Sequence, residues 1–180
     1  MAQQKKRIKI PTGYKPAIRE KIAQDILKTI RNRTTKQSLD KSGDKFAKYS
    51  KTYSQEKRKR KVNLKDTGDM MDALALLTHR SGWITVGYEK GYDGMGKVEG
   101  NRKGTYGKKK PIPGKARDFL GLTQEELDSI LNKYPRSSQD RFRGQQEDSL
   151  RDQARVLNNA QLERLERDAF FRQLGLDNNN

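Results

Sequence analysis

The sequence contains no cysteine and only one histidine, His79. Without cysteine there are no disulfides, no thiolate metal ligands and no cysteine nucleophile. One histidine cannot form the ligand cluster of a zinc site, and no HExxH pattern occurs. We expect His79 to be a cation at the end of a helix, where the helix dipole favours positive charge.

The carboxylates also show no pattern typical of acid–base catalysis or of a metal site. The pairs Asp69/Asp72 and Glu125/Glu126 both fall in the first turn of an expected helix, where acidic side chains are favoured by the helix dipole. A metal-dependent nuclease needs acids that cluster around its ions. We therefore expect no enzymatic activity, no metal and no cofactor.

Long apolar runs are also missing. No stretch approaches the roughly 20 apolar residues that a membrane-spanning helix needs, so we expect a soluble protein with no membrane contact. Hydrophobic residues make up 31% of the chain, whereas an ordinary globular domain has roughly 45–50%. The core is therefore expected to be thin, and some segments are expected to order only against a partner.

Positive charge is abundant, and it is concentrated at one end. Residues 1–66 hold 21 Lys/Arg against six Asp/Glu. Residues 67–122 hold ten against six, and residues 123–180 hold nine against eleven. This distribution predicts that the N-terminal third faces an anionic surface, either a nucleic acid or an acidic protein.

The order of apolar and polar residues predicts an α+β fold, in which a small antiparallel sheet packs with a few helices. Residues 1–15 are expected to form a basic N-terminal arm. A domain over residues 16–134 follows, with a helix from Pro16 whose Ile18, Ile22, Ile26 and Ile30 form one stripe. A second helix, capped by Asp66 or Thr67, is expected to run to residues 78–81.

The second half of this domain alternates a strand, a loop and a helix. Alternating apolar residues predict a strand over 83–88. Residues 90–116 are rich in glycine and lysine and are expected to form a long, mobile loop. Thr123 and Glu126 form a capping box for a helix over 124–132, flanked by Leu122 and Leu127 at the hydrophobic staple positions.

The C-terminal extension, residues 135–180, is expected to be a hinge followed by a separate helix. The hinge covers residues 136–144 and the helix covers 145–174. A narrow apolar stripe on a charged helix rarely stands alone in water, so we expect this helix to protrude and to pack on a neighbouring subunit or another protein. The stripe comprises Leu150, Ala154, Leu157, Leu165 and Ala169.

The most basic run of the sequence, residues 57–61, has two possible interpretations. Phe46, Tyr49 and Tyr53 precede it at helical spacing, which favours a small aromatic core beside a solvated basic face. The alternative is a platform on which bases stack while the cations hold phosphates. The candidate contacts to an anionic partner are Lys5, Lys6, Arg7, Lys57, Arg58, Lys59, Arg60 and Lys61.

Two segments carry a family resemblance. Residues 45–74 end in the pattern D-T-G-x-M-x-x-x-L, and residues 111–127 contain R-x-F-L-G-L before a capped helix. Together they resemble the tail-completion and virion-morphogenesis proteins of tailed bacteriophages, a group that includes the head–tail joining (neck) proteins. Asp118 stands where that family often has a proline. The motif residues are Asp66, Thr67, Gly68, Met70, Leu74, Arg117, Phe119, Leu120, Gly121 and Leu122.

The resemblance implies a structural virion protein. Family members form rings, so it implies a homo-oligomer of six or twelve copies. The ring would join the portal or adaptor to the tail around the path of the DNA, after assembly in the host cytoplasm. The alternative is a free basic nucleic-acid-binding protein, which would lose DNA affinity steeply with salt.

Overall fold

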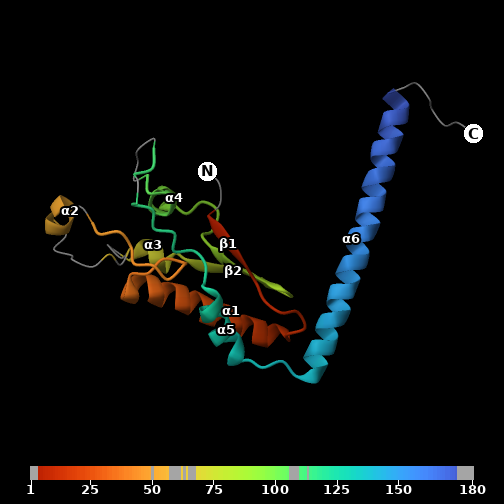
Figure 1. Cartoon of the computed structure of the whole chain (residues 1–180), viewed down its shortest axis with the longest axis horizontal. Coiled ribbons are helices and arrows are strands. Elements are labelled where there is room, and N and C mark those ends of the chain that lie inside the picture. The colour runs from red at the N-terminus through yellow and green to blue at the C-terminus, as the bar shows by residue number, and fades with distance from the viewer. Residues whose placement is uncertain are drawn as a thin grey trace, which may run out of the picture.

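The structure, a computed structural model, describes residues 4–49, 51–56, 62, 64, 68–105, 110–112 and 114–173. It confirms the α+β class: a three-stranded antiparallel sheet packs with helices, and the last helix stands away from the body (Figure 1). The elements are β1 (Lys5–Lys9), α1 (Pro16–Asn32), the π-helical turn η1 (Arg33–Gln37), α2 (Lys51–Glu56), α3 (Asp69–Asp72), β2 (Ala75–Arg80), β3 (Trp83–Gly87), α4 (Met95–Lys103), α5 (Gln124–Asn132) and α6 (Ser138–Gln173).

The sheet has the order β1-β3-β2, with both pairs antiparallel. The central strand β3 is the strand expected over residues 83–88. Ile8 of β1 and His79 of β2 both lie opposite Ile84 of β3. A β-bulge between Leu76 and Thr78 shifts the register of β2.

Strand β1 corrects the prediction of a basic arm over residues 1–15. Its residues are extended, as expected, but they form an edge strand of the sheet rather than an arm outside the domain. Ile8 and Ile10 are buried, while Lys5, Arg7 and Lys9 are exposed. The two isoleucines therefore bring the basic segment into the fold.

Helix α1 confirms the predicted apolar stripe. It begins with Pro16, whose fixed φ suits a first helical turn. Ile22, Ile26 and Ile30 are fully buried, and Ile18 packs at the margin of the core. Helix α1 contacts both β2 and α5, and Figure 1 shows α1 and α5 together on one side of the sheet.

The helix expected from residue 66 to residues 78–81 is wrong beyond Asp72. Helix α3 has only four residues, and the chain then forms β2. Arg31 Nη2 donates to the carbonyl oxygens of Asp72, at 3.0 Å, and Leu74, at 2.6 Å. Pairing with β3 then takes over the backbone hydrogen bonds, so tertiary context overrides the helical pattern.

The long loop expected over residues 90–116 contains a helix. Helix α4 buries Met95 and Val98, and it ends at Lys103, just before Gly104, which has a φ of 70°. The polar composition hid this helix because only one narrow side of it touches the core. Within the described residues, the loop prediction therefore fails for 95–103.

In the C-terminal region, α5 agrees with the prediction, and α6 begins earlier than predicted. Thr123 and Glu126 form the predicted capping box of α5. Helix α6 is 36 residues long and begins at Ser138, so most of the expected hinge over 136–144 is helical. None of the helices in the described part of the chain has the length and apolar content needed to cross a membrane.

Candidate functional site

The first three turns of α6 are fixed to the body by a close contact between two glycines. A Cβ on Gly13, which has a φ of +87°, would lie 1.9 Å from the carbonyl oxygen of Asp140. A Cβ on Gly144 would lie 2.9 Å from the carbonyl oxygen of Thr12. The loop between β1 and α1 therefore approaches α6 as closely as backbone allows.

Hydrogen bonds from two loops complete this attachment. Thr12 Oγ1 lies 2.9 Å from Asp148 Oδ2. At the tip of the β2–β3 hairpin, the Ser81 hydroxyl donates to Glu147, and Arg151 Nη2 donates to the Ser81 carbonyl oxygen at 2.7 Å. The attachment ends at Arg151.

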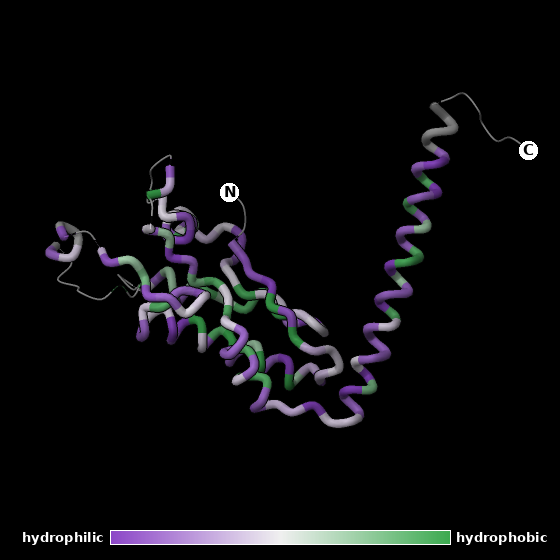
Figure 2. Tube along the Cα trace, in the orientation of Figure 1, coloured by the Kyte–Doolittle hydropathy of each residue, from purple (hydrophilic) through white to green (hydrophobic). Residues whose placement is uncertain are grey.

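Beyond Arg151 the helix leaves the body, and every described side chain from 152 to 168 is exposed. The predicted stripe begins at Leu150, beside the attachment, and continues along this part: Leu150, Leu157 and Leu165 are each about two-thirds exposed, and Ala154 is exposed between them. Ala169 lies outside the described side chains. Within the described part of the chain, the large exposed apolar residues all belong to α6: Phe142, Leu150, Val156, Leu157, Leu162 and Leu165. Figure 2 shows short apolar segments alternating with polar ones along this helix.

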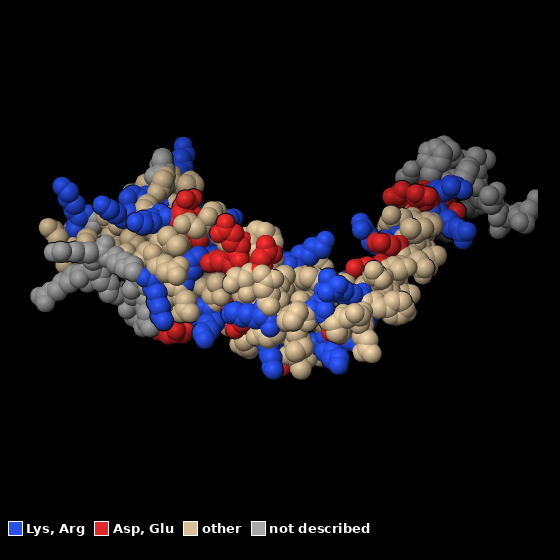
Figure 3. Space-filling model, turned by 60° about the horizontal axis from the view of Figure 1, so that its bottom comes forward, with Lys and Arg blue, Asp and Glu red and all other residues tan. Residues whose placement is uncertain are grey.

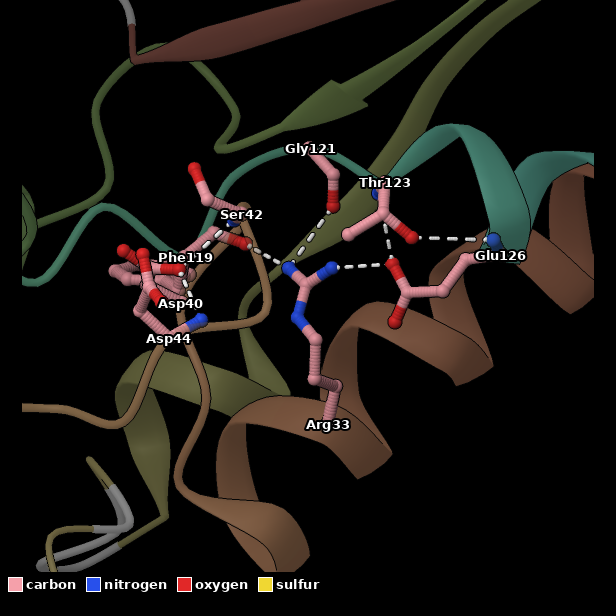
Figure 4. Close-up of polar contacts among 8 residues, drawn as sticks. All are labelled: Arg33, Asp40, Ser42, Asp44, Phe119, Gly121, Thr123 and Glu126. Carbon is pink, nitrogen blue, oxygen red and sulfur yellow. Dashed lines mark hydrogen bonds and ion pairs between the residues drawn. The ribbon is translucent and has the colours of Figure 1, made fainter.

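The R-x-F-L-G-L segment is held by a buried arginine (Figure 4). Arg33 is 2% exposed, and its Nη2 donates to the carbonyl oxygens of Phe119 and Gly121, both at 2.9 Å. Arg33 Nη1 lies 2.6 Å from Glu126 Oε2. Sequence analysis missed Arg33, because a basic residue at the end of α1 resembles an ordinary dipole partner.

Arg117 of the same segment is also structural. Its guanidinium lies 4.9 Å from the centre of the Tyr49 ring and 3.3 Å from both Asn101 Oδ1 and the Ala47 carbonyl oxygen. The side chain is buried, so it joins α4 to the segment before α2. An arginine with these partners supports packing and offers no free charge to a ligand.

Asp118 bridges two cations. Its carboxylate lies 2.8 Å from Lys41 Nζ and 2.8 Å from Arg102 Nε. Burial acts to raise the pKa of Asp118, but the hydrogen bonds from Arg102 and Lys41 outweigh it, so the pKa lies below its ordinary value. A proline at this position would lack this bridge.

The remaining motif residues pack in or beside the core. Met70, Leu74, Phe119 and Leu120 are buried, and Leu122 is half-buried. The two glycines adopt positive φ, 106° at Gly68 and 139° at Gly121, where a side chain would be strained. Asp66 and Thr67 lie outside the described residues. The motif residues that are described therefore build the fold.

The basic candidates divide between two places. Lys5, Lys6 and Arg7 are exposed on β1. The run at 57–61 lies outside the described residues, as does the side chain of Tyr53. Phe46 is buried in the core, which favours the aromatic-core interpretation for this residue over the stacking platform. Figure 3 shows Lys and Arg spread over the body, with both signs of charge on α6.

The residues considered for catalysis are not brought together. His79 lies on β2 rather than at a helix end, so the prediction of a C-terminal helix cation is wrong. Asp69 and Asp72 lie in α3, whereas Glu126 belongs to the Arg33 ion pair and the α5 cap. Among the described residues no three His, Asp or Glu side chains gather as metal ligands.

Comparison with protein-family models, with curated proteins and with solved structures gives no match for this chain. The family resemblance therefore depends on the two motif segments alone. The described motif residues pack in or beside the core, whereas the projecting part of α6 and the cations of β1 are exposed.

Proposed function

We propose that this chain is a structural virion protein of a tailed phage, a ring subunit of the neck that joins the portal or adaptor to the tail. One observation carries the proposal: α6 extends past the body and presents leucines to solvent. A 36-residue helix is about 54 Å long, and a polar helix with a narrow apolar stripe gains its stability from a partner.

The way α6 is attached supports assembly rather than a flexible tail. The Gly13–Gly144 contact and the Ser81–Arg151 hydrogen bond fix its first turns, so its direction is set by the body. A helix with a fixed direction places its stripe at a defined position on a neighbour. Repeated around an axis, such a contact between two different surfaces forms a ring when its rotation closes. The family resemblance implies six or twelve copies.

The polar network beneath the motif residues supports the same proposal. Arg33, Arg117 and Asp118 bind backbone and side chains of their own chain, so they stiffen the subunit. A subunit that works by surface complementarity needs a rigid body and exposed contact surfaces. Both features are present in the described part of the chain.

The test is the mass of the particle in solution, measured by light scattering over a range of concentrations. We expect the wild-type chain to form a closed oligomer and the stripe variant Leu157→Ser/Leu165→Ser to stay monomeric. The matched control is Val156→Ser, which removes an apolar side chain of the same exposure at about 100° or more of helix rotation from every stripe residue, and it should still assemble. A wild-type chain that stays monomeric and is absent from purified virions would overturn the proposal.

A further inference from the structure

The face of the sheet opposite α1 is basic. Residues on alternate positions of a strand share one face. Ile8 and Ile84 are buried on the core side, so their strand neighbours point outward. The register then places the following residues on the outer side, here named the basic sheet face: Lys5, Arg7 and Lys9 of β1, Trp83 and Thr85 of β3, and Thr78 and Arg80 of β2.

The cations on this face form a regular array. Lys5, Arg7 and Lys9 follow one another at about 6.8 Å, twice the rise of an antiparallel strand. Lys9 and Arg80 both lie opposite Trp83, so they flank it about 10 Å apart across the sheet. These four cations are exposed, whereas Trp83 is half-buried between them.

No carboxylate neutralises this array within the sheet. The sequences of the three strands contain no Asp or Glu. Across the described part of the chain, the ion pairs involve neither the three β1 cations nor Arg80. Desolvating these cations against a polyanion would therefore break no ion pair between described residues.

Arg7 is also held in place. Its guanidinium carbon lies 5.0 Å from the centre of the Trp83 ring, in a cation–π contact. An arginine fixed in this way loses less side-chain freedom when it binds, and its planar fork suits the two oxygens of a phosphate.

We propose that the basic sheet face binds the phosphate backbone of double-stranded DNA. A nucleic-acid backbone offers regularly spaced negative charges, and this face offers regularly spaced positive ones without acids among them. The contact would be independent of base sequence, because phosphate oxygens are the same at every base pair. The proposal does not depend on α6 or on ring formation.

The experiment measures binding of a fluorescently labelled duplex by the full chain over a series of salt concentrations. The variant Lys5→Gln/Lys9→Gln removes two charges from the face. Its matched control, Lys21→Gln/Lys28→Gln, removes two exposed charges from α1 on the opposite side of the body. We expect the face variant to make the negative slope of log K against log salt shallower by about 1.8, because each lost phosphate contact reduces its magnitude by roughly 0.9. The control should keep the wild-type slope.

Trp83 is the only tryptophan in the chain, so its emission reports on this face directly. We expect its fluorescence to change in parallel with the DNA signal, and single-stranded DNA of the same length to bind more weakly. Equal slopes for the two double variants, or DNA saturation without a change in Trp83 emission, would overturn the proposal. Displacement of DNA by polyglutamate of equal charge would overturn it in favour of an acidic protein partner.

Two further measurements keep the outcomes distinct. Near-ultraviolet circular dichroism of each variant checks that the fold is kept, since the replaced lysines are exposed and support no packing. The stripe variant Leu157→Ser/Leu165→Ser, as a monomer, should still show the change in Trp83 emission when DNA is added. Loss of that response would contradict the independence of the sheet face, whereas a monomeric wild type that binds DNA would contradict only the ring.

Discussion

Arg33 Nη1 lies 2.6 Å from Glu126 Oε2, and this ion pair joins the C-terminal end of α1 to the first turn of α5. The same carboxylate oxygen accepts from the Thr123 backbone N–H at 3.0 Å. Because Arg33 also donates to the carbonyl oxygens of Phe119 and Gly121, one buried side chain fastens the motif segment to the helix that follows it.

Removal of the Glu126 side chain should destabilise the body. Glu126→Ala leaves the buried Arg33 without its counter-ion and removes half of the capping box. We expect the free energy of unfolding, measured with urea, to fall by about 2–3 kcal/mol. The control is Glu125→Ala in the same helical turn, an exposed position whose loss should cost about 0.5 kcal/mol. Equal costs at the two positions would show that Arg33 does not depend on Glu126.

The Asp118 bridge should make stability depend on pH in the acidic range. The folded-state pKa of Asp118 is lowered by Arg102 and Lys41 against the opposing effect of burial. A lowered pKa gives a contribution that is complete above the unfolded-state value, about 3.9, and is lost as the pH falls through the folded-state value. Asp118→Asn should therefore cost about 1 kcal/mol at pH 7 and progressively less below pH 4.

The measurement for this prediction is the urea midpoint of wild type and variant at pH 7 and at pH 3. Asp152→Asn, an exposed position on α6, serves as the control. The difference between wild type and Asp118→Asn should shrink at pH 3, while the control difference stays constant. A cost for Asp118→Asn that is the same at both pH values would contradict the bridge.

The sequence predicted correctly those elements whose pattern of apolar and capping residues lies within one short segment. The isoleucine stripe of α1, the alternation in β3 and the capping box at Thr123 each lie within a few residues, and the structure confirms all three. The strand β2 was missed because its Leu76 and Leu77 suit a helix equally well. Only pairing with β3, the central strand, decides in favour of a strand.

The candidate site was less predictable because its residues meet across the chain. Arg33 and Phe119, or Arg7 and Trp83, are far apart in sequence, and no pattern links them. The basic residues of β1 were recognised as contacts, but Lys9, Arg80 and Trp83 join them only through strand register. The projecting helix was predicted because its apolar stripe and its charged face are both visible in the local sequence, without knowledge of tertiary contacts.

The contact between Gly13 and Gly144 should control the direction of α6. Gly144→Ala adds a Cβ that would lie 2.9 Å from the Thr12 carbonyl oxygen, so the helix or the loop must move. Alanine favours the helix itself by about 1 kcal/mol, so helix content should be kept while the attachment loosens. We expect faster hydrogen exchange at residues 12–14. We also expect a broader distribution of interatomic distances from small-angle scattering, because α6 would adopt several directions. Ser149→Ala, on the exposed side of the same helix, should change neither.

The cysteine-free sequence allows one introduced thiol to show which side of α6 is covered on assembly. Leu157→Cys places a probe on the stripe, and Asn159→Cys places one on the opposite side of the same turn, because two residues correspond to about 200° of helix rotation. Both positions are exposed in the single chain. With an environment-sensitive dye, we expect the emission at position 157 to shift to shorter wavelength as concentration rises, and the emission at position 159 to stay constant. Equal shifts at both positions would mean that the helix is enclosed on all sides, and a shift at 159 alone would place the interface on the charged face.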